Sequence, residues 1–188
     1  MIALFTELGN EVPSEPIIFL KPPTAVLPPN GTIVRPPISQ RVDYEGELAI
    51  VIGREARNIR RANWRHYVRG FTCANDVTAR DLQRKDIQFT RGKSFDTFCP
   101  LGPCIETELD PSDLPIQTRV NGVTKQNGRT SQMVFPCDFL IEFITAVMTL
   151  LPGDVILTGT PAGVGPLNAG DVVEVEIGGI GTLRNVVA

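Results

Sequence analysis

The run EGELAIVIG, residues 45–53, ends in a continuous series of apolar side chains that a glycine closes. Because this series is rich in β-branched residues, it predicts a strand that is buried on both faces. Glu45 and Glu47 stand at its start, and their two-residue spacing places both side chains on one face of an extended chain. A lone Glu-x-Glu is typical of a solvated strand edge, but the apolar run that follows favours a position next to the core.

A third carboxylate can be placed near this pair. Asp76 follows a second apolar strand, predicted at residues 71–74. Close carboxylates repel one another unless water or a cation lies between them. Three carboxylates with water would form the all-oxygen site that Mg²⁺ or Mn²⁺ prefers. The residues alone make this a hypothesis.

The other predicted elements are short. Prolines crowd the first forty residues and exclude long helices there, which leaves short strands at 17–20 and 32–34. Residues 62–68, with Trp64, are predicted as a short helix, and another is predicted to begin at Thr78, with Asp81 in its first turn. Asn121–Gly122 predicts a tight hairpin between 117–120 and 123–126.

The last third of the chain fixes the expected fold class. A helical stripe of apolar residues begins after Asp138, which is a candidate N-cap, and strands are predicted at 155–157, 172–177 and 182–187. Helices do not alternate regularly with strands. We therefore expect a sheet-rich α+β roll or sandwich with a few short helices, and not a doubly wound sheet.

Size and charge favour a single-domain protein that binds neither nucleic acid nor a membrane. The chain has 188 residues and a formal net charge of −3, which favours one domain over residues 1–188 and no attraction to nucleic acid or an anionic membrane. No apolar stretch reaches the roughly 20 residues that span a bilayer. The first residues lack the pattern of a secretory signal, so we expect a cytoplasmic protein. The four cysteines are irregularly spaced and are predicted to be buried free thiols.

Six motifs in order resemble the fumarylacetoacetate hydrolase family. They cover roughly residues 7 to 187 and lie at residues 19–22, 42–53, 75–81, 93–96, 152–154 and 158–165. The chain is most similar to the short, single-domain branch of acylpyruvate hydrolases and oxaloacetate decarboxylases. The resemblance implies a mixed β-roll of the fumarylacetoacetase C-terminal-domain type, which agrees with the predicted strands.

The resemblance also implies the roles of individual residues. It makes Glu45, Glu47 and Asp76 the ligands of a Mg²⁺ or Mn²⁺ ion. It further implies that the substrate is bound by residues that include Gln83, Thr160 and Arg80, and that Lys93 is a catalytic residue beside the developing enolate. We expect Arg80 to form a structural pair with Asp81 near the metal rather than to act as a catalyst.

One family feature is incomplete. Hydrolytic members carry a His-x-x-Glu dyad on a mobile N-terminal lid, where it activates water. This sequence keeps Glu7, a second candidate catalytic residue, but has Leu4 where the histidine belongs. We therefore expect a truncated or altered lid. The one histidine, His66, lies far along the chain and is expected to be an incidental surface residue.

Three functions remain open at this stage. The branch favours metal-dependent hydrolysis of a C–C bond in an acylpyruvate such as fumarylpyruvate, from aromatic catabolism. The missing histidine keeps open reactions that need no activated water, namely isomerisation of 2-hydroxyhepta-2,4-diene-1,7-dioate or decarboxylation or tautomerisation of oxaloacetate. A non-catalytic metal-binding relative is the third alternative. In each case the expected partner is a small 2-oxo acid, and the resemblance implies a homodimer.

Overall fold

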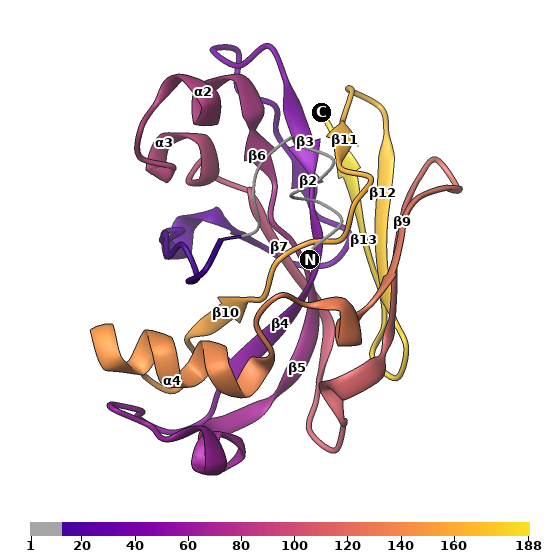
Figure 1. Cartoon of the computed structure of the whole chain (residues 1–188). Helices are drawn as coiled ribbons and strands as arrows, with labels where there is room; N and C mark the ends of the chain where they lie inside the picture. Colours follow the sequence, from indigo (N-terminus) through magenta and orange to yellow (C-terminus); the bar gives the residue numbers. More distant parts are fainter. Residues whose placement is uncertain (1–12) are drawn as a thin grey trace.

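The computed structural model describes residues 13–188 (Figure 1). Two five-stranded sheets and one three-stranded sheet make up most of the fold. One large sheet has, in spatial order, β1 (Val26–Leu27), β7 (Cys99–Glu106), β5 (Val68–Asn75), β4 (Gly46–Ile52) and β10 (Val155–Leu157). The other has β2 (Thr32–Ile33), β13 (Gly181–Val187), β12 (Val172–Ile177), β8 (Pro115–Val120) and β9 (Val123–Arg129). The small sheet has β11 (Gly165–Pro166), β3 (Val42–Tyr44) and β6 (Thr78–Ala79).

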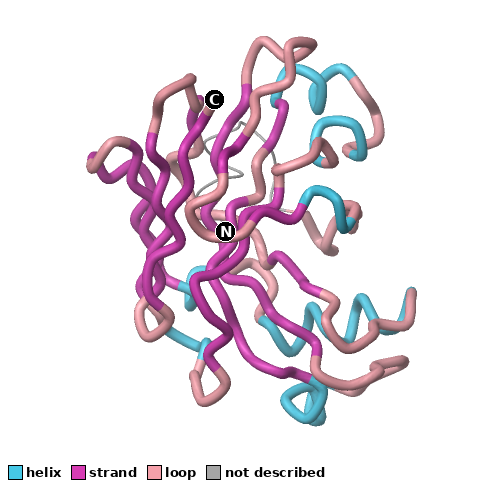
Figure 2. Tube along the Cα trace, turned by 180° about the vertical axis from the view of Figure 1, so that it is seen from behind, coloured by secondary structure: helices cyan, strands magenta, loops and turns pink. Residues whose placement is uncertain are grey.

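The helices are short, and the three α-helices lie to one side of the central strands. They are α2 (Arg80–Lys85), α3 (Thr90–Lys93) and α4 (Cys137–Val147), with 3₁₀ turns η1 (Pro23–Ala25), η2 (Arg61–Tyr67), η3 (Pro111–Asp113) and η4 (Thr130–Gln132). The three α-helices and the β12–β13 pair flank β4 and β5 from opposite sides, as the view from behind also shows (Figure 2). This arrangement confirms the predicted sheet-rich α+β class.

The core explains why β4 is apolar throughout. Every residue of β4 is buried, as the predicted two-faced strand requires. Leu48 and Ile50 belong to one hydrophobic cluster with Val175 of β12 and Ile141 of α4. Strand β4 therefore packs against several elements at once, and this packing restricts the positions of the acids at its start.

Several predicted elements are confirmed. The hairpin β8–β9 turns at Asn121 and Gly122, which have φ angles of 52° and 76°, as a type I′ turn requires. The strands predicted at 155–157, 172–177 and 182–187 are β10, β12 and β13. Within residues 13–188, no helix is both long and apolar enough to cross a bilayer.

Other predictions were wrong. Residues 17–20 form no strand; Phe19 instead packs edge-on against Phe89, with ring centroids 5.8 Å apart. Asp138 does not cap α4, because Pro136 holds the N-cap position and the Asp138 carboxylate pairs with Arg61 at 3.0 Å. Three cysteines are buried as predicted, but Cys104 is exposed.

Candidate metal centre

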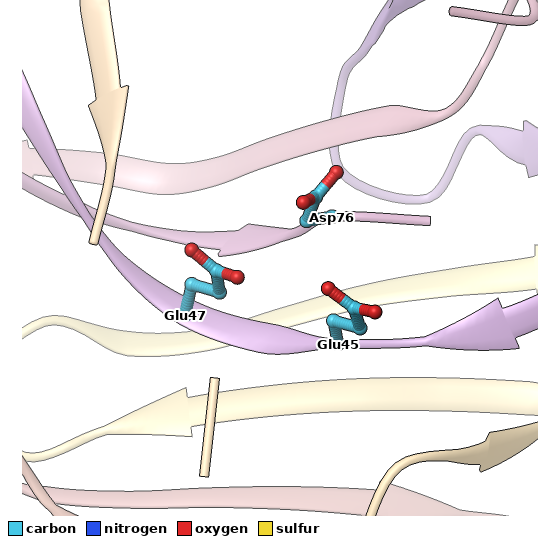
Figure 3. A group of neighbouring side chains, drawn as sticks. All are labelled: Glu45, Glu47 and Asp76. Atoms are coloured by element: carbon cyan, nitrogen blue, oxygen red, sulfur yellow. The ribbon is translucent and has the colours of Figure 1, made fainter. Parts of the chain in front are cut away.

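The register of two antiparallel strands brings the three acids together. β4 pairs with β5 so that Gly46 lies opposite Asn75. The same antiparallel register, extended by one residue, places Glu45 opposite Asp76 just beyond the strand ends. The Asp76 amide donates to the Glu45 carbonyl oxygen at 2.8 Å. Glu47 lies two residues further along β4 and therefore on the same face as Glu45. Figure 3 shows both glutamates projecting from this strand towards Asp76.

The three carboxylates have the spacing of a metal site. Glu45, Glu47 and Asp76 are all buried, and each offers an oxygen within 4.8 Å of the others. Burial of three like charges is costly without cations nearby. The surrounding side chains show how much of that cost is already offset.

Three buried cations bind two of the acids and a fourth carboxylate. Lys93 Nζ donates to Glu45 Oε2 at 2.9 Å and to Asp76 Oδ2 at 2.6 Å. Lys21 Nζ donates to the other Asp76 oxygen at 2.7 Å. Arg80 pairs with Glu45 and, at 2.9 Å, with Asp43, which the half-exposed Arg41 also binds.

These ion pairs settle the charge state of Lys93 and Asp76. Burial alone would lower the pKa of Lys93, but Asp76 and Glu45 raise it above its usual value, so the ammonium stays charged. Burial alone would raise the pKa of Asp76, but Lys21 and Lys93 together lower it. Asp76 is therefore ionised at neutral pH.

Glu47 is the exception. Among residues 13–188 no cationic side chain pairs with it, and its Oε2 accepts a hydrogen bond from the Gly159 amide at 2.6 Å. Burial, followed by the charges of Asp76 and Glu45, raises the pKa of Glu47 to about 8. A divalent ion among the three carboxylates would supply the missing positive charge through oxygen ligands, so the donor set fits a hard cation such as Mg²⁺ or Mn²⁺.

A buried amide fixes the residue between the two glutamates. Gln126 Oε1 accepts the Gly46 amide at 2.9 Å, and Gln126 Nε2 donates to Thr160 Oγ1 at 2.8 Å. The Thr160 hydroxyl donates in turn to the Gly46 carbonyl oxygen at 2.8 Å. At Gly46 itself, a Cβ atom would lie 2.1 Å from Thr118 Oγ1, so a larger residue cannot enter without displacement. Sequence reasoning assigned no role to Gln126, nor to Lys21, although Lys21 lies in the motif at residues 19–22.

A cavity of about 790 Å³ opens beside the three acids. It brings together every described residue that the sequence assigned to metal or substrate, and the rest of its lining is largely apolar. Those residues are Glu45, Glu47, Asp76, Arg80, Gln83, Lys93 and Thr160. Glu7 lies outside the described residues.

Three other sequence expectations can be placed. His66 is exposed on η2, as predicted. The expected Arg80–Asp81 pair was wrong, because Asp81 accepts hydrogen bonds from Ser39 Oγ at 2.6 Å and from the Gln40 amide at 2.9 Å. Arg80 points the other way and, besides its carboxylates, donates to Gln83 Oε1 at 2.6 Å.

Comparison with known proteins places these features in a family. The family model described as fumarylacetoacetate (FAA) hydrolase C-terminal matches residues 3–188. A protein of Methanocaldococcus jannaschii is 58% identical over 181 residues, covering 96% of this chain and 76% of that protein. A human mitochondrial oxaloacetate tautomerase is 47% identical over 193 residues, covering 96% of this chain and 62% of the human protein.

Solved structures agree with the sequence match. The crystal structure of 2-hydroxyhepta-2,4-diene-1,7-dioate isomerase from Mycobacterium marinum has a TM-score of 0.93 to this chain at 54% identity. The superposition covers 94% of this chain and 70% of that one. Because the family model spans nearly the whole chain and the match in fold is equally extensive, the chain belongs to the fumarylacetoacetate hydrolase family.

Proposed function

We propose that this chain binds one divalent cation at Glu45, Glu47 and Asp76 and interconverts tautomers or double-bond isomers of a small 2-oxo acid. The observation that carries the proposal is the set of three buried carboxylates, with oxygens within 4.8 Å of one another, in the wall of a cavity. The names of two relatives, an oxaloacetate tautomerase and a dienedioate isomerase, support this class of reaction ahead of C–C bond hydrolysis.

The cation and its protein neighbours would divide the work. When bound, a divalent ion supplies Lewis-acid polarisation of the 2-oxo group, which favours loss of a proton from the adjacent carbon. Lys93 adds a fixed positive charge on the same side of the cavity, since its raised pKa keeps it protonated. Lys21 and Lys93 hold the two oxygens of Asp76 in place.

The apolar wall favours the same chemistry. Phe135, Leu140 and Leu157 line the cavity together with the acids. Apolar walls limit the water around the reacting atoms, and electrostatic interactions are stronger where water is scarce. Such an environment strengthens the electrostatic stabilisation of a proton shift between carbon and oxygen, and this reaction needs no attacking water.

Hydrolysis remains the second outcome to be tested. It requires a base that activates water, and no histidine lines the cavity in the part of the chain that the structure describes. The predicted base, Glu7, is one of the residues that the structure does not describe. Hydrolysis by this chain stays a prediction from the resemblance.

Two measurements test the proposal. Calorimetry on metal-stripped protein should show uptake of one Mg²⁺ or Mn²⁺ per chain, which Glu45→Gln weakens and Glu55→Gln, at an exposed site, leaves intact. With metal present, enol absorbance of oxaloacetate should relax faster than in buffer, without release of pyruvate. Release of pyruvate from an acylpyruvate would favour hydrolysis instead, and absence of metal uptake would contradict the whole proposal.

A further inference from the structure

One cation on the cavity wall has no role in the metal centre. Arg80, Arg84 and Lys93 are the basic residues in the described lining of the cavity. The guanidinium of Arg80 binds Asp43, Glu45 and Gln83, and the ammonium of Lys93 binds Glu45 and Asp76. The side chain of Arg84 is exposed and forms no ion pair or hydrogen bond with any residue of 13–188.

The position of Arg84 follows from the helix that carries it. Arg80 and Arg84 are four residues apart in α2, so both side chains lie on the face that borders the cavity. Arg84 is displaced from Arg80 by about 6 Å along the helix axis. This displacement sets the Arg84 guanidinium, which is unpaired within residues 13–188, apart from the Arg80 guanidinium that contacts Glu45.

Apart from Arg84, the described lining contains no other unpaired cation that could bind a second anionic group. Apart from the groups already paired, it consists largely of apolar side chains such as Ile17, Phe89 and Phe135. A ligand whose 2-oxo acid end lies at the three carboxylates would therefore meet one available charged donor further out. Arginine recognises a carboxylate through two parallel hydrogen bonds, which gives both affinity and orientation.

We infer that Arg84 binds the second carboxylate of a 2-oxo dicarboxylic acid and selects diacids over 2-oxo monoacids of the same length. The inference rests on the proposed function, because it assumes that the 2-oxo acid end of the ligand lies at the metal centre. Arg84 is then a specificity-determining residue. It differs from Arg80 and Lys93, which hold the protein's own carboxylates.

A binding experiment isolates this role from catalysis. The probes are two pairs of equal length, 2-oxoglutarate with 2-oxovalerate and 2-oxoadipate with 2-oxohexanoate, titrated by calorimetry into protein loaded with Mg²⁺. Wild-type protein should prefer the diacid of at least one pair. The diacid preference is the Kd of the monoacid divided by the Kd of the diacid. In Arg84→Gln this ratio should fall roughly ten- to hundredfold, which corresponds to the loss of a charge-assisted hydrogen bond.

Lys85→Gln is the matched control. Lys85 is the next residue of α2, equally basic and exposed, but it does not line this cavity. It should leave the Kd ratio unchanged, and both variants should keep the wild-type Tm, since both side chains are exposed. An equal loss of diacid preference in Lys85→Gln would indicate a general field of positive charge and would overturn the inference.

The outcomes separate the inference from the proposed function. If wild-type protein binds diacids and monoacids equally well and still accelerates enol relaxation of oxaloacetate, the proposed function stands and the role of Arg84 is refuted. If Arg84→Gln keeps the full diacid preference, the role is also refuted. If Mg²⁺ itself does not bind, the proposed function fails, and the inference fails with it.

Discussion

Glu47 differs from the two acids beside it because no cationic side chain of residues 13–188 neutralises it. Glu45 lies against Arg80 and Lys93, and Asp76 lies against Lys21 and Lys93. Loss of a carboxylate from a buried ion pair leaves its cation with less compensating charge, whereas replacement of a carboxyl group that must bind a proton to stay buried removes that cost. Neutral replacements at Glu45 and Glu47 should therefore have opposite effects on the metal-free protein.

We expect Glu45→Gln to lower the free energy of unfolding of metal-free protein by about 1.5–3 kcal/mol, because Arg80 and Lys93 each lose one of two buried carboxylate partners and keep only Asp43 and Asp76, respectively. Glu47→Gln should raise it, on the order of 1–3 kcal/mol at pH 7, because the raised pKa of Glu47 already shows that the site disfavours its charge. Urea unfolding in the presence of a chelator measures both values. Equal destabilisation by the two variants would contradict the charge assignment.

The same two variants should agree on metal affinity. Changes to residues that only contact metal ligands weaken metal binding by about 10- to 100-fold. Each of these variants removes one of the three proposed ligands itself, so each should weaken Mn²⁺ binding by more than that. Glu47→Gln would then be more stable than wild type without metal and would gain little stability with it. This combination of effects is not expected of a carboxylate that serves only the fold.

Thiol chemistry offers a test away from the centre. Burial raises the pKa of Cys73 and Cys137 to about 12 and that of Cys99 to about 11, so these thiols stay protonated as well as covered. Cys104 is exposed. We expect one thiol per native chain to react promptly with a disulfide reagent at pH 8, and Cys104→Ser to abolish that reaction. Prompt reaction of further thiols, or of none, would contradict the described burial.

Some residues of the centre could be predicted from the sequence and others could not. Glu45 and Glu47 carry a local signal, because their spacing and the apolar run after them can be seen in one short segment. Lys21 and Gln126 act on Asp76 and Gly46 across 55 and 80 residues of chain. Gln126 resembles an ordinary polar residue in its own surroundings, and the motif at 19–22 contains Lys21 without indicating its contact with Asp76, so only the fold reveals the role of either residue.

At the scale of elements, the acids depend on the contact between β4 and the opposite sheet. Gly46 faces Thr118 of β8, and a Cβ atom at Gly46 would lie 2.1 Å from the Thr118 hydroxyl oxygen. That hydroxyl is buried and has no hydrogen-bond partner among residues 13–188. Without it, the next contacts of the added Cβ would lie at 3.2 Å and 3.3 Å, which small shifts can absorb. The contact can therefore be tested by a double-mutant cycle.

Gly46→Ala should destabilise the chain by about 1–3 kcal/mol through overpacking and should also weaken metal binding, because it displaces the start of β4. Thr118→Ala alone should change stability little, since it removes an unsatisfied hydroxyl. The double variant should recover most of the stability lost in Gly46→Ala. Unfolding midpoints and Mn²⁺ titrations of all four proteins measure the coupling, and simple additivity would refute the steric explanation.

Strands with a clear local sequence pattern could be predicted, and strands without one could not. β4, the β8–β9 hairpin and the strands β10, β12 and β13 have either apolar patterns or specific turn residues, and all were found. β7 was missed because Pro100, Gly102 and Pro103 interrupt it, although it pairs with both β1 and β5. Residues 17–20 are the opposite case: their sequence is typical of a strand, but they pair with no strand and instead contact side chains of Phe89 and Ser94.

For the whole molecule, the three carboxylates of the proposed metal centre are a local source of instability within a well-packed fold. Family membership and fold class are established, whereas the homodimer and the cytoplasmic location stay predictions. Three buried carboxyl groups lie between β4 and the end of β5, and Glu47 is the one that no cationic side chain of residues 13–188 pairs with. Global stability should therefore respond to pH and to metal through this residue.

The pH dependence has a definite sign. The pKa of Glu47 rises from 4.5, its ordinary value, to about 8 in the folded chain, so between these limits the folded state holds a proton that the unfolded state has released. Stability then falls as pH rises through this window. The lowered pKa of Asp76 and the raised pKa of Lys93 act outside it, at lower and higher pH respectively.

We therefore expect the Tm of metal-free protein to fall between pH 6 and pH 8, and the fall to be smaller in Glu47→Gln, whose amide does not titrate. Saturating Mg²⁺ should raise the Tm of wild-type protein most at the upper end of this range, because the ion binds the ionised carboxylate and favours the folded state by mass action. Thermal unfolding with chelator and with Mg²⁺ at several pH values gives all three comparisons. If Glu47→Gln showed the same pH profile as wild type in chelator, the decrease would have to originate in other groups, and Glu47 would not be the residue that links metal, protons and folding.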